Sequence, residues 1–344
     1  MTGSLRTRPL GASGLALTEV GYGGAAVGNL YVPYDDASAR RSITAAIDAG
    51  IRYFDTAPSY GFGLSERRIG DAVRGRSDIV LSTKIGRLLR PDGSVTDDRE
   101  RQGFRSSMPF TPVFDYTRDG IMRSFEASLQ RLGLARVSML YVHDIGTLTH
   151  GKDDAVHFDA LTRGGGLSAL EDLRAAGAID GFGVGVNEVA ACERVMDIVV
   201  LDAILLAGRY TLLDQSALTA LLPTCARTGT AVVIGGPYNS GILANGVSGP
   251  GTHRFDYGDA PAEIVARVAD IEMACVRHGV PLAAAALQFP LAHPAVASVI
   301  PGLASPEQVA ETLRLYHWPI PSSLWDELRE ARLIAADAPV PEGR

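Results

Sequence analysis

The stretch YFDTAPSYG, residues 53–61, ends a buried apolar run with an aspartate, Asp55, and places a tyrosine, Tyr60, in the loop that follows. Similar short runs rich in β-branched residues recur along the 344-residue chain, each followed by an amphipathic segment. This alternation predicts strands joined by helices. The predicted strands cover residues 18–24, 51–56, 78–84, 137–143, 179–186, 201–207, 230–236 and 296–300.

Helical segments fill the intervals, and several of them end at a glycine, as a left-handed C-terminal cap requires. Eight apolar strands with helical crossovers favour an α/β fold of the closed, parallel (β/α)8 or TIM-barrel type over an open sheet. A Rossmann fold is disfavoured because GYGGAAVG (21–28) leads into a loop and not into a helix. The predicted helices cover residues 36–50, 64–75, 117–133, 165–177, 187–199, 214–229 and 281–292.

We expect a single domain, residues 1–344, with a barrel core at about 8–316 and a C-terminal tail at 317–344. The chain is 46% hydrophobic and carries a formal net charge of -7. Without a long basic run it is a poor match for nucleic acid or an anionic membrane. Without an apolar signal core or an 18-residue apolar stretch it is expected to be cytoplasmic, with a small-molecule substrate. No pattern indicates an oligomeric state.

A metal site is not expected. His143, His150 and His157 recur at intervals of seven, but the residues between them read as a loop, where equal spacing does not create a shared face. No CxxC pair occurs either, and the cysteines are expected to be reduced core residues: Cys192, Cys225 and Cys275.

Three long insertions, residues 86–116, 144–165 and 237–260, each follow a predicted strand. In barrel enzymes the loops after the strands build the active site. Long loops are commonly lids or binding loops, although a disordered surface insertion is an open alternative.

Four titratable side chains lie at or just after strand ends: Asp55, Tyr60, Lys84 and His143. Each of them alone could simply stabilise a turn or be a polar group at the rim of the barrel. Lys84 stands out because the chain has 32 Lys and Arg residues, of which only Lys84 and Lys152 are lysines.

Together these four groups form a plausible acid–base device. A tyrosine hydroxyl ordinarily titrates near about 10, so it needs a nearby cation to act as a base at neutral pH. Lys84 can supply that cation, Asp55 can hold the ammonium in place, and His143 can bind the substrate oxygen. None of the four can carry electrons, so a redox reaction would need a hydride carrier.

FDTAPSYG (54–61), STKIG (82–86) and YVHD (141–144) together resemble the aldo-keto reductases. The resemblance spans roughly residues 8–316 and implies a (β/α)8 oxidoreductase that uses a nicotinamide cofactor. It implies that Asp55, Tyr60, Lys84 and His143 form the catalytic tetrad, with Tyr60 as the general acid or base.

The resemblance also implies where the cofactor binds. In GGPYNSGIL (235–243) Gly235 stands where the family has a stacking tyrosine, and Ala207 replaces a glutamine. Ser305 is expected to cap a helix whose N-terminus receives the pyrophosphate, with Gln308 at the capping-box position. The implied cofactor residues are Asn187, Gly236, Pro237, Asn239, Gly241, Pro301, Gly302, Ser305, Gln308 and Glu311.

NAD is expected in preference to NADP. Relatives that prefer the phosphorylated cofactor hold its 2′-phosphate with a lysine and an arginine, and this chain has Gly302 and Gln308 at those positions. A doubly charged phosphate would lack its cationic partners there.

GGAAVGNLY (23–31), GRLLRPDG (86–93) and HDIGTLTHG (143–151) resemble the family branch that oxidises L-fucose and other D-threo-aldoses at C1, and relatives that oxidise pyridoxal at C4. Both substrates are largely cyclic hemiacetals that give lactones on loss of hydride. We favour an aldose as the broader class, with pyridoxal oxidation or general aldehyde and ketone reduction as alternatives. Loop aromatics could form a wall for a pyridine ring or could simply pack the loops: Tyr22, Phe62, Phe104, Phe110 and Phe114.

Two other protein classes are less consistent with the chain. A metal-dependent barrel hydrolase would usually show an HxH pair after the first strand, and GYGGAAVG has none. A redox-sensing regulatory subunit is an alternative that the presence of all four tetrad residues disfavours.

Overall fold

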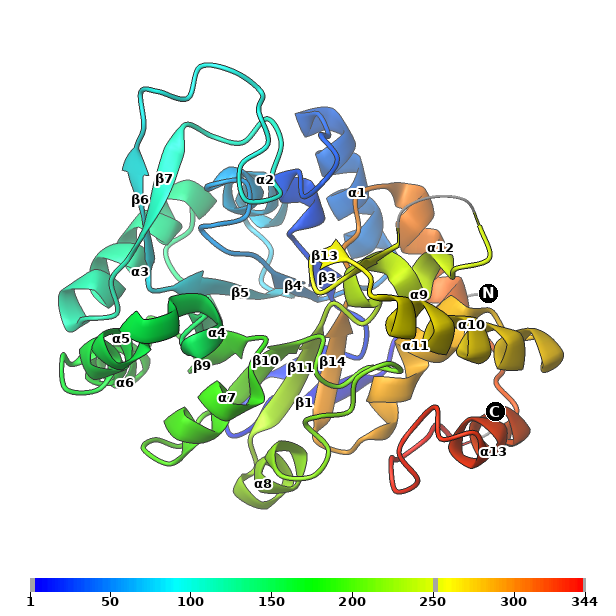
Figure 1. The fold of residues 1–344 in the computed structure, drawn as a ribbon. Coiled ribbons are helices and arrows are strands. Elements are labelled where there is room, and N and C mark those ends of the chain that lie inside the picture. The colour runs from blue at the N-terminus through cyan, green and yellow to red at the C-terminus, as the bar shows by residue number, and fades with distance from the viewer. Residues whose placement is uncertain (1–3, 250–252, 343–344) are drawn as a thin grey trace.

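The computed structural model describes residues 4–249 and 253–342, and at its centre is a sheet of eight parallel strands (Figure 1). Neighbours in the sheet follow the order β14-β11-β10-β9-β8-β5-β4-β3. The strands are β3 (Tyr22–Gly23), β4 (Tyr53–Asp55), β5 (Val80–Ile85), β8 (Met139–His143), β9 (Gly181–Val186), β10 (Ala203–Ala207), β11 (Ala231–Gly235) and β14 (Val296–Ile300).

The first and last strands close the sheet into a barrel. Parallel bridges join Val20 to Val299 and Gly23 to Gly302. The Gly21 N–H donates to the Val299 carbonyl at 2.9 Å, so no open edge is left between β3 and β14. The predicted TIM barrel is therefore confirmed, with a first strand shorter than the predicted 18–24.

Helices cover the outside of the barrel. Asp35 caps the first of them by accepting from the Ser38 N–H at 2.7 Å, and Gly133, with φ 65°, ends the third. One predicted helix starts late, at Leu221 and not at residue 214, because a turn from Thr211 to Asp214 occupies the chain before it. The main helices are α1 (Asp36–Asp48), α2 (Leu64–Val73), α3 (Arg118–Leu132), α6 (Gly166–Ala175), α7 (Val189–Met196), α8 (Leu221–Thr228), α11 (Leu282–Gln288) and α12 (Pro306–Tyr316).

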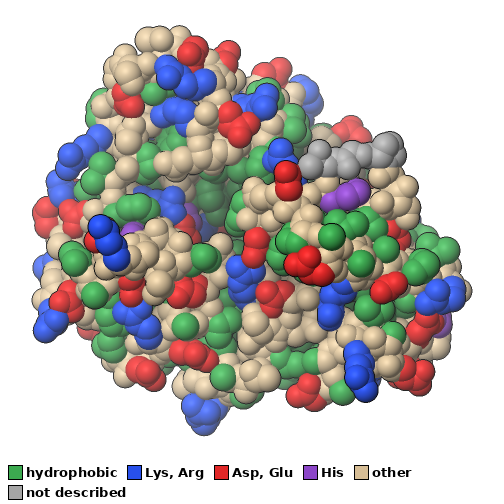
Figure 2. Space-filling view, in the orientation of Figure 1, with side chains coloured by type: hydrophobic (Ala, Val, Ile, Leu, Met, Phe, Trp, Pro, Cys, Tyr) green, Lys and Arg blue, Asp and Glu red, His purple; other side chains and the backbone are tan. Residues whose placement is uncertain are grey.

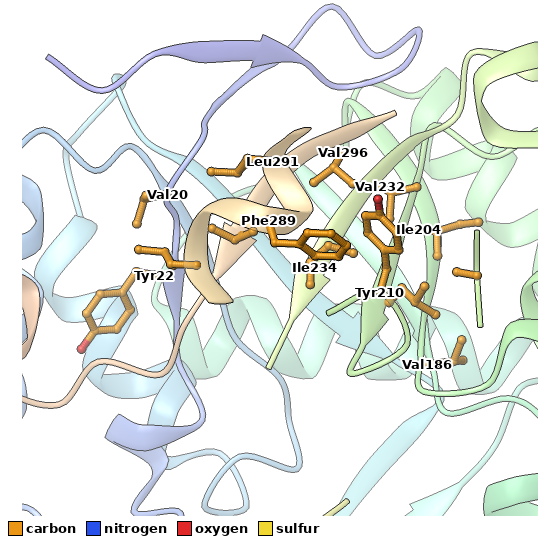
Figure 3. Packing of buried hydrophobic residues seen from close by; sticks show 14 of the residues in the cluster. Val20, Tyr22, Val186, Ile204, Tyr210, Val232, Ile234, Phe289, Leu291 and Val296 are labelled. Atoms are coloured by element: carbon orange, nitrogen blue, oxygen red, sulfur yellow. The ribbon is translucent and has the colours of Figure 1, made fainter. Parts of the chain in front are cut away.

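Two hydrophobic layers follow from the alternation of side chains along each strand. On β10, Leu205 points into the barrel, whereas Ile204 and Leu206 face the helices. Figure 3 shows the outer layer, where Ile204, Val232 and Ile234 pack near Tyr210 and Phe289.

An N-terminal hairpin that the sequence analysis missed seals the amino end of the barrel. Strands β1 (Thr7–Pro9) and β2 (Ala16–Thr18) pair in antiparallel fashion. Leu10 and Leu17 are fully buried in the inner cluster beneath Tyr53 and Tyr141. The open end, where a site can form, is therefore the carboxyl end of the strands.

The three insertions are ordered elements at that carboxyl end. Residues 86–116 contain an antiparallel hairpin, 144–165 fold mainly as helices, and 237–260 contain short helices and a small hairpin (Figure 1). The disordered alternative is thus wrong for their described residues. Their elements are β6 (Arg87–Pro91), β7 (Phe110–Phe114), α4 (Thr147–His150), η2 (Gly151–Asp153), α5 (Asp154–Leu161), η3 (Asn239–Gly241), α9 (Ile242–Asn245), β12 (Arg254–Phe255) and β13 (Gly258–Asp259).

The predicted tail packs as part of the outer core. Helix α13 (Ser322–Glu330) contacts α10 (Ala262–Arg277), and its Leu324, Trp325 and Leu328 are buried in the outer hydrophobic cluster. Of the described helices, none is long and apolar enough to cross a membrane.

Candidate active site

Alternate residues on three neighbouring strands point into the barrel at its carboxyl end. Asp55 ends β4, Lys84 is the next-to-last residue of β5, and His143 ends β8, with β5 paired to both neighbours. Because side chains alternate along a strand, the residues two positions earlier form the layer below. Their hydroxyls are linked, Tyr53 to Ser82 at 3.0 Å and Tyr53 to Tyr141 at 3.4 Å.

The Lys84 ammonium is the centre of the site. Its Nζ donates to Asp55 Oδ2 at 2.6 Å, to the Thr56 carbonyl at 3.0 Å and to the Tyr60 hydroxyl oxygen at 3.1 Å. Each ammonium proton therefore has an acceptor, and the side chain is held in one position. The structure thus joins three of the predicted residues, Asp55, Lys84 and Tyr60, in one hydrogen-bonded chain.

The Asp55–Lys84 pair is completely buried, and its short contact is that of an ionised pair. Burial is the largest influence on the pKa of Lys84 and lowers it, but Asp55 and then Tyr60 outweigh that influence, so the pKa is raised overall. Burial raises the pKa of Asp55, against the opposing effects of Lys84 and Ser82. The lysine accordingly stays protonated beside the tyrosine oxygen.

His143 completes the predicted set and lies beside Tyr60. The two ring centroids lie 6.1 Å apart in an edge-to-face arrangement. Burial lowers the pKa of His143 well below its ordinary value, and the Arg87 guanidinium and Lys84 ammonium lower it further. The imidazole is therefore uncharged at neutral pH and can donate one hydrogen bond.

Two further residues that the sequence analysis did not single out support the site. Ser82 donates to Asp55 Oδ1 at 2.7 Å, and its position two residues before Lys84 on the same strand was the available signal. Gly185 lies on β9, where a Cβ atom would come within 3.4 Å of Lys84 Cε and 3.2 Å of Tyr141 Cβ. No local signal identifies Gly185, because its role is to leave space for side chains that come from other strands, Tyr141 on β8 and Lys84 on β5.

A cleft of about 720 Å³ opens beside Tyr60 and Asp55 and runs to helix α12. Figure 2 shows a hollow in this face, with hydrophobic side chains in its depth and Lys, Arg and His side chains at one edge. Six of the predicted cofactor residues line the cleft: Gly236, Asn239, Gly241, Gly302, Gln308 and Glu311.

The other predicted cofactor residues do not line the cleft. Pro237 and Pro301 are buried next to lining glycines, and Ser305 is part of the α12 cap. Asn187 follows β9, and its backbone carbonyl accepts from Arg209 Nε at 2.9 Å. Tyr238 and Ala207 do line the cleft, close to Gly235.

The N-terminus of α12 forms as predicted, with one difference. The Ser305 side chain accepts from the Gln308 N–H at 3.2 Å. The Gln308 side chain reaches back to the N–H of Ala304 at 2.7 Å, one residue earlier than a standard capping box. Gln308 is therefore used in the cap as well as in the cleft wall.

The cleft residues fit a nicotinamide dinucleotide. The Asn239 side chain is buried, and its Oδ1 has no hydrogen-bond partner among the described residues. A Cβ atom at Gly236 would meet nothing within 4 Å, and one at Gly302 only Ala26, so both backbones face open space. A buried polar atom without a partner and an accessible backbone are features that a bound ligand can satisfy.

Of the candidate aromatic wall, Tyr22 is placed elsewhere. Its hydroxyl is hydrogen-bonded to Ser42 on α1 at 3.0 Å, and its ring stacks on Phe54 with centroids 5.2 Å apart. The outward face of β3 puts this side chain in the helix layer, so the alternative of a substrate wall is wrong for Tyr22.

Phe104, from the first insertion, comes closest to the tetrad. Its ring centroid lies 6.1 Å from that of Tyr60 and also 6.1 Å from that of Phe62. Phe110 and Phe114 are half-buried on β7. The first insertion therefore brings an apolar surface to the edge of the catalytic tyrosine candidate.

Two of the three histidines in the series come together. The ring centroids of His150 and His157 lie 3.9 Å apart with their planes tilted by 33°, because residues 147–161 are mainly helical; the prediction of a loop there is wrong. In residues 4–249 and 253–342 no group of three His, Cys, Asp or Glu side chains could hold a metal ion. The cysteines are free thiols and buried, as predicted.

The chain belongs to the aldo/keto reductase family, whose sequence model matches residues 19–332. Members of this family are oxidoreductases that use nicotinamide cofactors. The resemblance noted in the sequence is thereby confirmed.

Two curated relatives match nearly the whole chain. A pyridoxal 4-dehydrogenase of Microbacterium luteolum is 46% identical over 340 residues, covering 95% of this chain and 98% of the relative. A D-threo-aldose 1-dehydrogenase of Pseudomonas sp is 41% identical over 339 residues, covering 94% of this chain and 96% of the relative. Among solved structures, aldo-keto reductase AKR11C1 from Bacillus halodurans in its holo form has a TM-score of 0.73 at 25% identity and covers 98% of both chains.

Proposed function

We propose that this protein is an NAD-dependent dehydrogenase that oxidises a cyclic hemiacetal to a lactone, most simply an aldose at C1. The observation that carries the proposal is the hydrogen-bonded chain from Asp55 through Lys84 to Tyr60, with the uncharged His143 beside it. These hydrogen-bonded side chains lie beside a cleft that fits a dinucleotide.

In this mechanism Tyr60 takes the proton of the hemiacetal hydroxyl. The Lys84 ammonium, 3.1 Å from the phenol oxygen, stabilises the negative charge on that oxygen, and Asp55 keeps the ammonium in position. His143 donates a hydrogen bond to the same substrate oxygen and orients it. NAD supplies the hydride acceptor. Positioned proton transfer of this kind contributes about 10²- to 10⁴-fold to the rate.

The charges at the far end of the cleft support NAD over NADP. Glu307 and Glu311 line the cleft where α12 begins, together with Gln308. The hydrogen bond to Ser305 lowers the pKa of Glu307, and the hydrogen bond to Arg314 lowers that of Glu311, so both carboxylates are ionised at neutral pH. Two carboxylates would repel a 2′-phosphate but can accept hydrogen bonds from a ribose hydroxyl.

Pyridoxal is the second candidate substrate, and two observations favour it. The relative with 46% identity is a pyridoxal 4-dehydrogenase, against 41% for the aldose 1-dehydrogenase. Phe104 beside Tyr60 also offers an aromatic surface on which a pyridine ring could stack.

A screen for NADH formation tests the proposal, with L-fucose, D-arabinose, L-galactose and pyridoxal as substrates and each reaction repeated with NADP. We expect turnover with at least one substrate and a higher kcat/KM with NAD. Tyr60→Phe should abolish turnover and leave the affinity for NAD, measured by fluorescence titration, unchanged. Lack of NADH formation with all four substrates, or full activity of Tyr60→Phe, would refute the proposal. Reduction of simple aldehydes alone would identify a general reductase.

A further inference from the structure

A half-buried ion pair adjoins His143 and is not part of the tetrad. Arg87 begins β6, three residues after Lys84, and Asp144 directly follows His143. An Arg87 NH2 group donates to Asp144 Oδ2, and only 14% and 21% of these two side chains are exposed. The guanidinium also lies 4.9 Å from the centroid of the Phe114 ring on β7. Arginine keeps its charge at any ordinary pH, so the positive charge of Arg87 is permanent.

The Asp144 carboxylate is held next to the imidazole by an unusual backbone conformation. Asp144 has a φ of 51°, and its N–H donates to the Gly185 carbonyl at 2.9 Å. Such a conformation costs energy in a residue with a side chain and persists only where its surroundings impose it. Here it brings Asp144 Oδ2 to 3.5 Å from His143 Nε2.

The surroundings of the ring discriminate between its two neutral forms. Nδ1 of His143 is buried and has no hydrogen-bond partner among the described residues. A proton on Nδ1 would be an unsatisfied buried donor and would leave the Nε2 lone pair facing a carboxylate. A proton on Nε2 faces the Asp144 oxygen. The Nε2–H tautomer is therefore favoured.

A lone carboxylate at this distance would also favour the imidazolium, and the groups packed around the ring oppose that effect. Arg87 from β6 neutralises Asp144, and Lys84 from β5 adds a second positive charge. The ring of Tyr60, from the loop after β4, lies edge-to-face with the imidazole. The Tyr116 hydroxyl donates to the backbone carbonyl of His143 at 2.7 Å and is also hydrogen-bonded to His150 Nε2 at 3.0 Å. Charge and burial thus act together to keep the ring neutral.

We propose that Arg87 and Asp144 are positioning residues for His143: Asp144 selects the Nε2–H tautomer, and Arg87 cancels the charge of Asp144 so that the imidazole remains an uncharged donor. The inference rests on the proposed function in taking the substrate oxygen as the acceptor. The state of the ring itself can be measured without substrate.

The primary test is ¹⁵N NMR of the imidazole rings in the full-length protein, titrated between about pH 5 and 8. The His143 signal is assigned by its loss in His143→Gln. In the unaltered protein we expect the Nε2–H pattern and no titration near the ordinary histidine value of about 6.5. An Nδ1–H pattern, or titration near that value, would overturn the proposal.

Two substitutions should change the His143 ring in different ways. Arg87→Met removes the cation and exposes the ring to an unpaired carboxylate, so a titration of His143 should appear within the measured range. Asp144→Asn tolerates the positive φ and removes the anion, so His143 should still not titrate in that range, but the second tautomer should appear. No titration in Arg87→Met, or an unchanged Nε2–H pattern in Asp144→Asn, would contradict the proposal, since mere loosening of the loop would not depend on the sign of the charge removed.

Controls separate charge from general damage. Arg87→Lys keeps the positive charge and should leave the pKa of His143 low. This variant also provides a result if Arg87→Met does not fold. Arg90→Met makes the same change at an exposed position of β6 and should leave His143 unaffected. Once a substrate is known, Arg87→Met should lower kcat/KM by about 10- to 100-fold, with the loss largest at the acid end of the pH profile. Absence of any dehydrogenase activity would refute the proposed function but leave the NMR result standing.

Discussion

A single methyl group added at Gly185 should weaken the hydrogen bond between Lys84 and Tyr60, the candidate catalytic tyrosine. Gly185 has no left-handed backbone conformation, so alanine is allowed there and the effect of Gly185→Ala depends on contacts alone. The new Cβ would lie 3.2 Å from Tyr141 Cβ, 3.4 Å from Lys84 Cε and 3.6 Å from Lys84 Cδ. Comfortable carbon–carbon separations are about 3.5–4.0 Å, so a neighbour must move by a few tenths of an ångström.

The lysine side chain is the group that can move, because Tyr141 Cβ is fixed to the backbone of β8. When Lys84 shifts, the charge-assisted bond to Asp55 at 2.6 Å should persist and the weaker bond to Tyr60 at 3.1 Å should lengthen. We expect kcat to fall about 10- to 100-fold through this misplacement. Overpacking should also lower the free energy of unfolding by about 1–3 kcal/mol.

The assay is steady-state NADH formation beside urea denaturation and NAD binding. Gly185 does not line the described cleft, so the Kd for NAD should stay unchanged. Gly93→Ala, at a position where a Cβ atom meets nothing within 4 Å, is the matched control and should behave as the unaltered protein. A Gly185→Ala enzyme that keeps its kcat within twofold, although folded, would show that the Lys84–Tyr60 contact is not limiting.

Three further predictions follow from the site and its surroundings. Asp55→Asn leaves the buried Lys84 ammonium without its counter-ion and should lower the free energy of unfolding by about 3–5 kcal/mol in urea denaturation. Glu307→Gln combined with Gln308→Arg should raise the NADP/NAD ratio of kcat/KM by about tenfold or more, because one charge-assisted bond is gained and one repulsion removed. Burial, then the adjacent histidine, lowers the pKa of His150 to about 4. The unfolded chain binds that proton at higher pH, so stability should decline as pH falls from about 6.5 to about 4.

Each of these has a result that would contradict it. Unchanged stability of Asp55→Asn would mean that the lysine is not charged in the folded protein. An unchanged cofactor ratio would place the 2′ position away from α12. The His150→Gln variant should lose the acid-side slope, and an identical slope in both proteins would assign it to other groups.

Much of the barrel could be predicted because its strands are buried on both faces. Runs such as LDAILLA (201–207) and TAVVIGG (230–236) are apolar apart from Asp202 and Thr230, and each contains a strand of the closed sheet. The α12 cap was also predictable, since Ser305, Pro306 and Gln308 act on backbone groups within one turn. Such signals are local and can be read from neighbouring residues.

Elements that depend on distant partners were missed. Strands β1 and β2 have three residues each, and their hairpin lies against the distant strand β14, where Arg8 donates to the Val296 carbonyl. The helices within 144–165 lack a clear apolar period, since α5 packs through polar aromatic side chains. Its His157 ring, for example, contacts the ring of Phe114 on β7. Tyr22 was grouped with the loop aromatics because its sequence neighbours do not reveal that β3 turns it toward α1.

The sequence by itself determined the barrel class, the four candidate catalytic residues and their positions at or just after strand ends, because strand period and motif spacing are properties of consecutive residues. Only the tertiary structure decided how these groups act on one another. The space that Gly185 leaves for Lys84, and the approach of Arg87 to Asp144 beside His143, join residues on different strands. Their contacts depend on register and closure of the sheet, and the local pattern of a single strand carries neither.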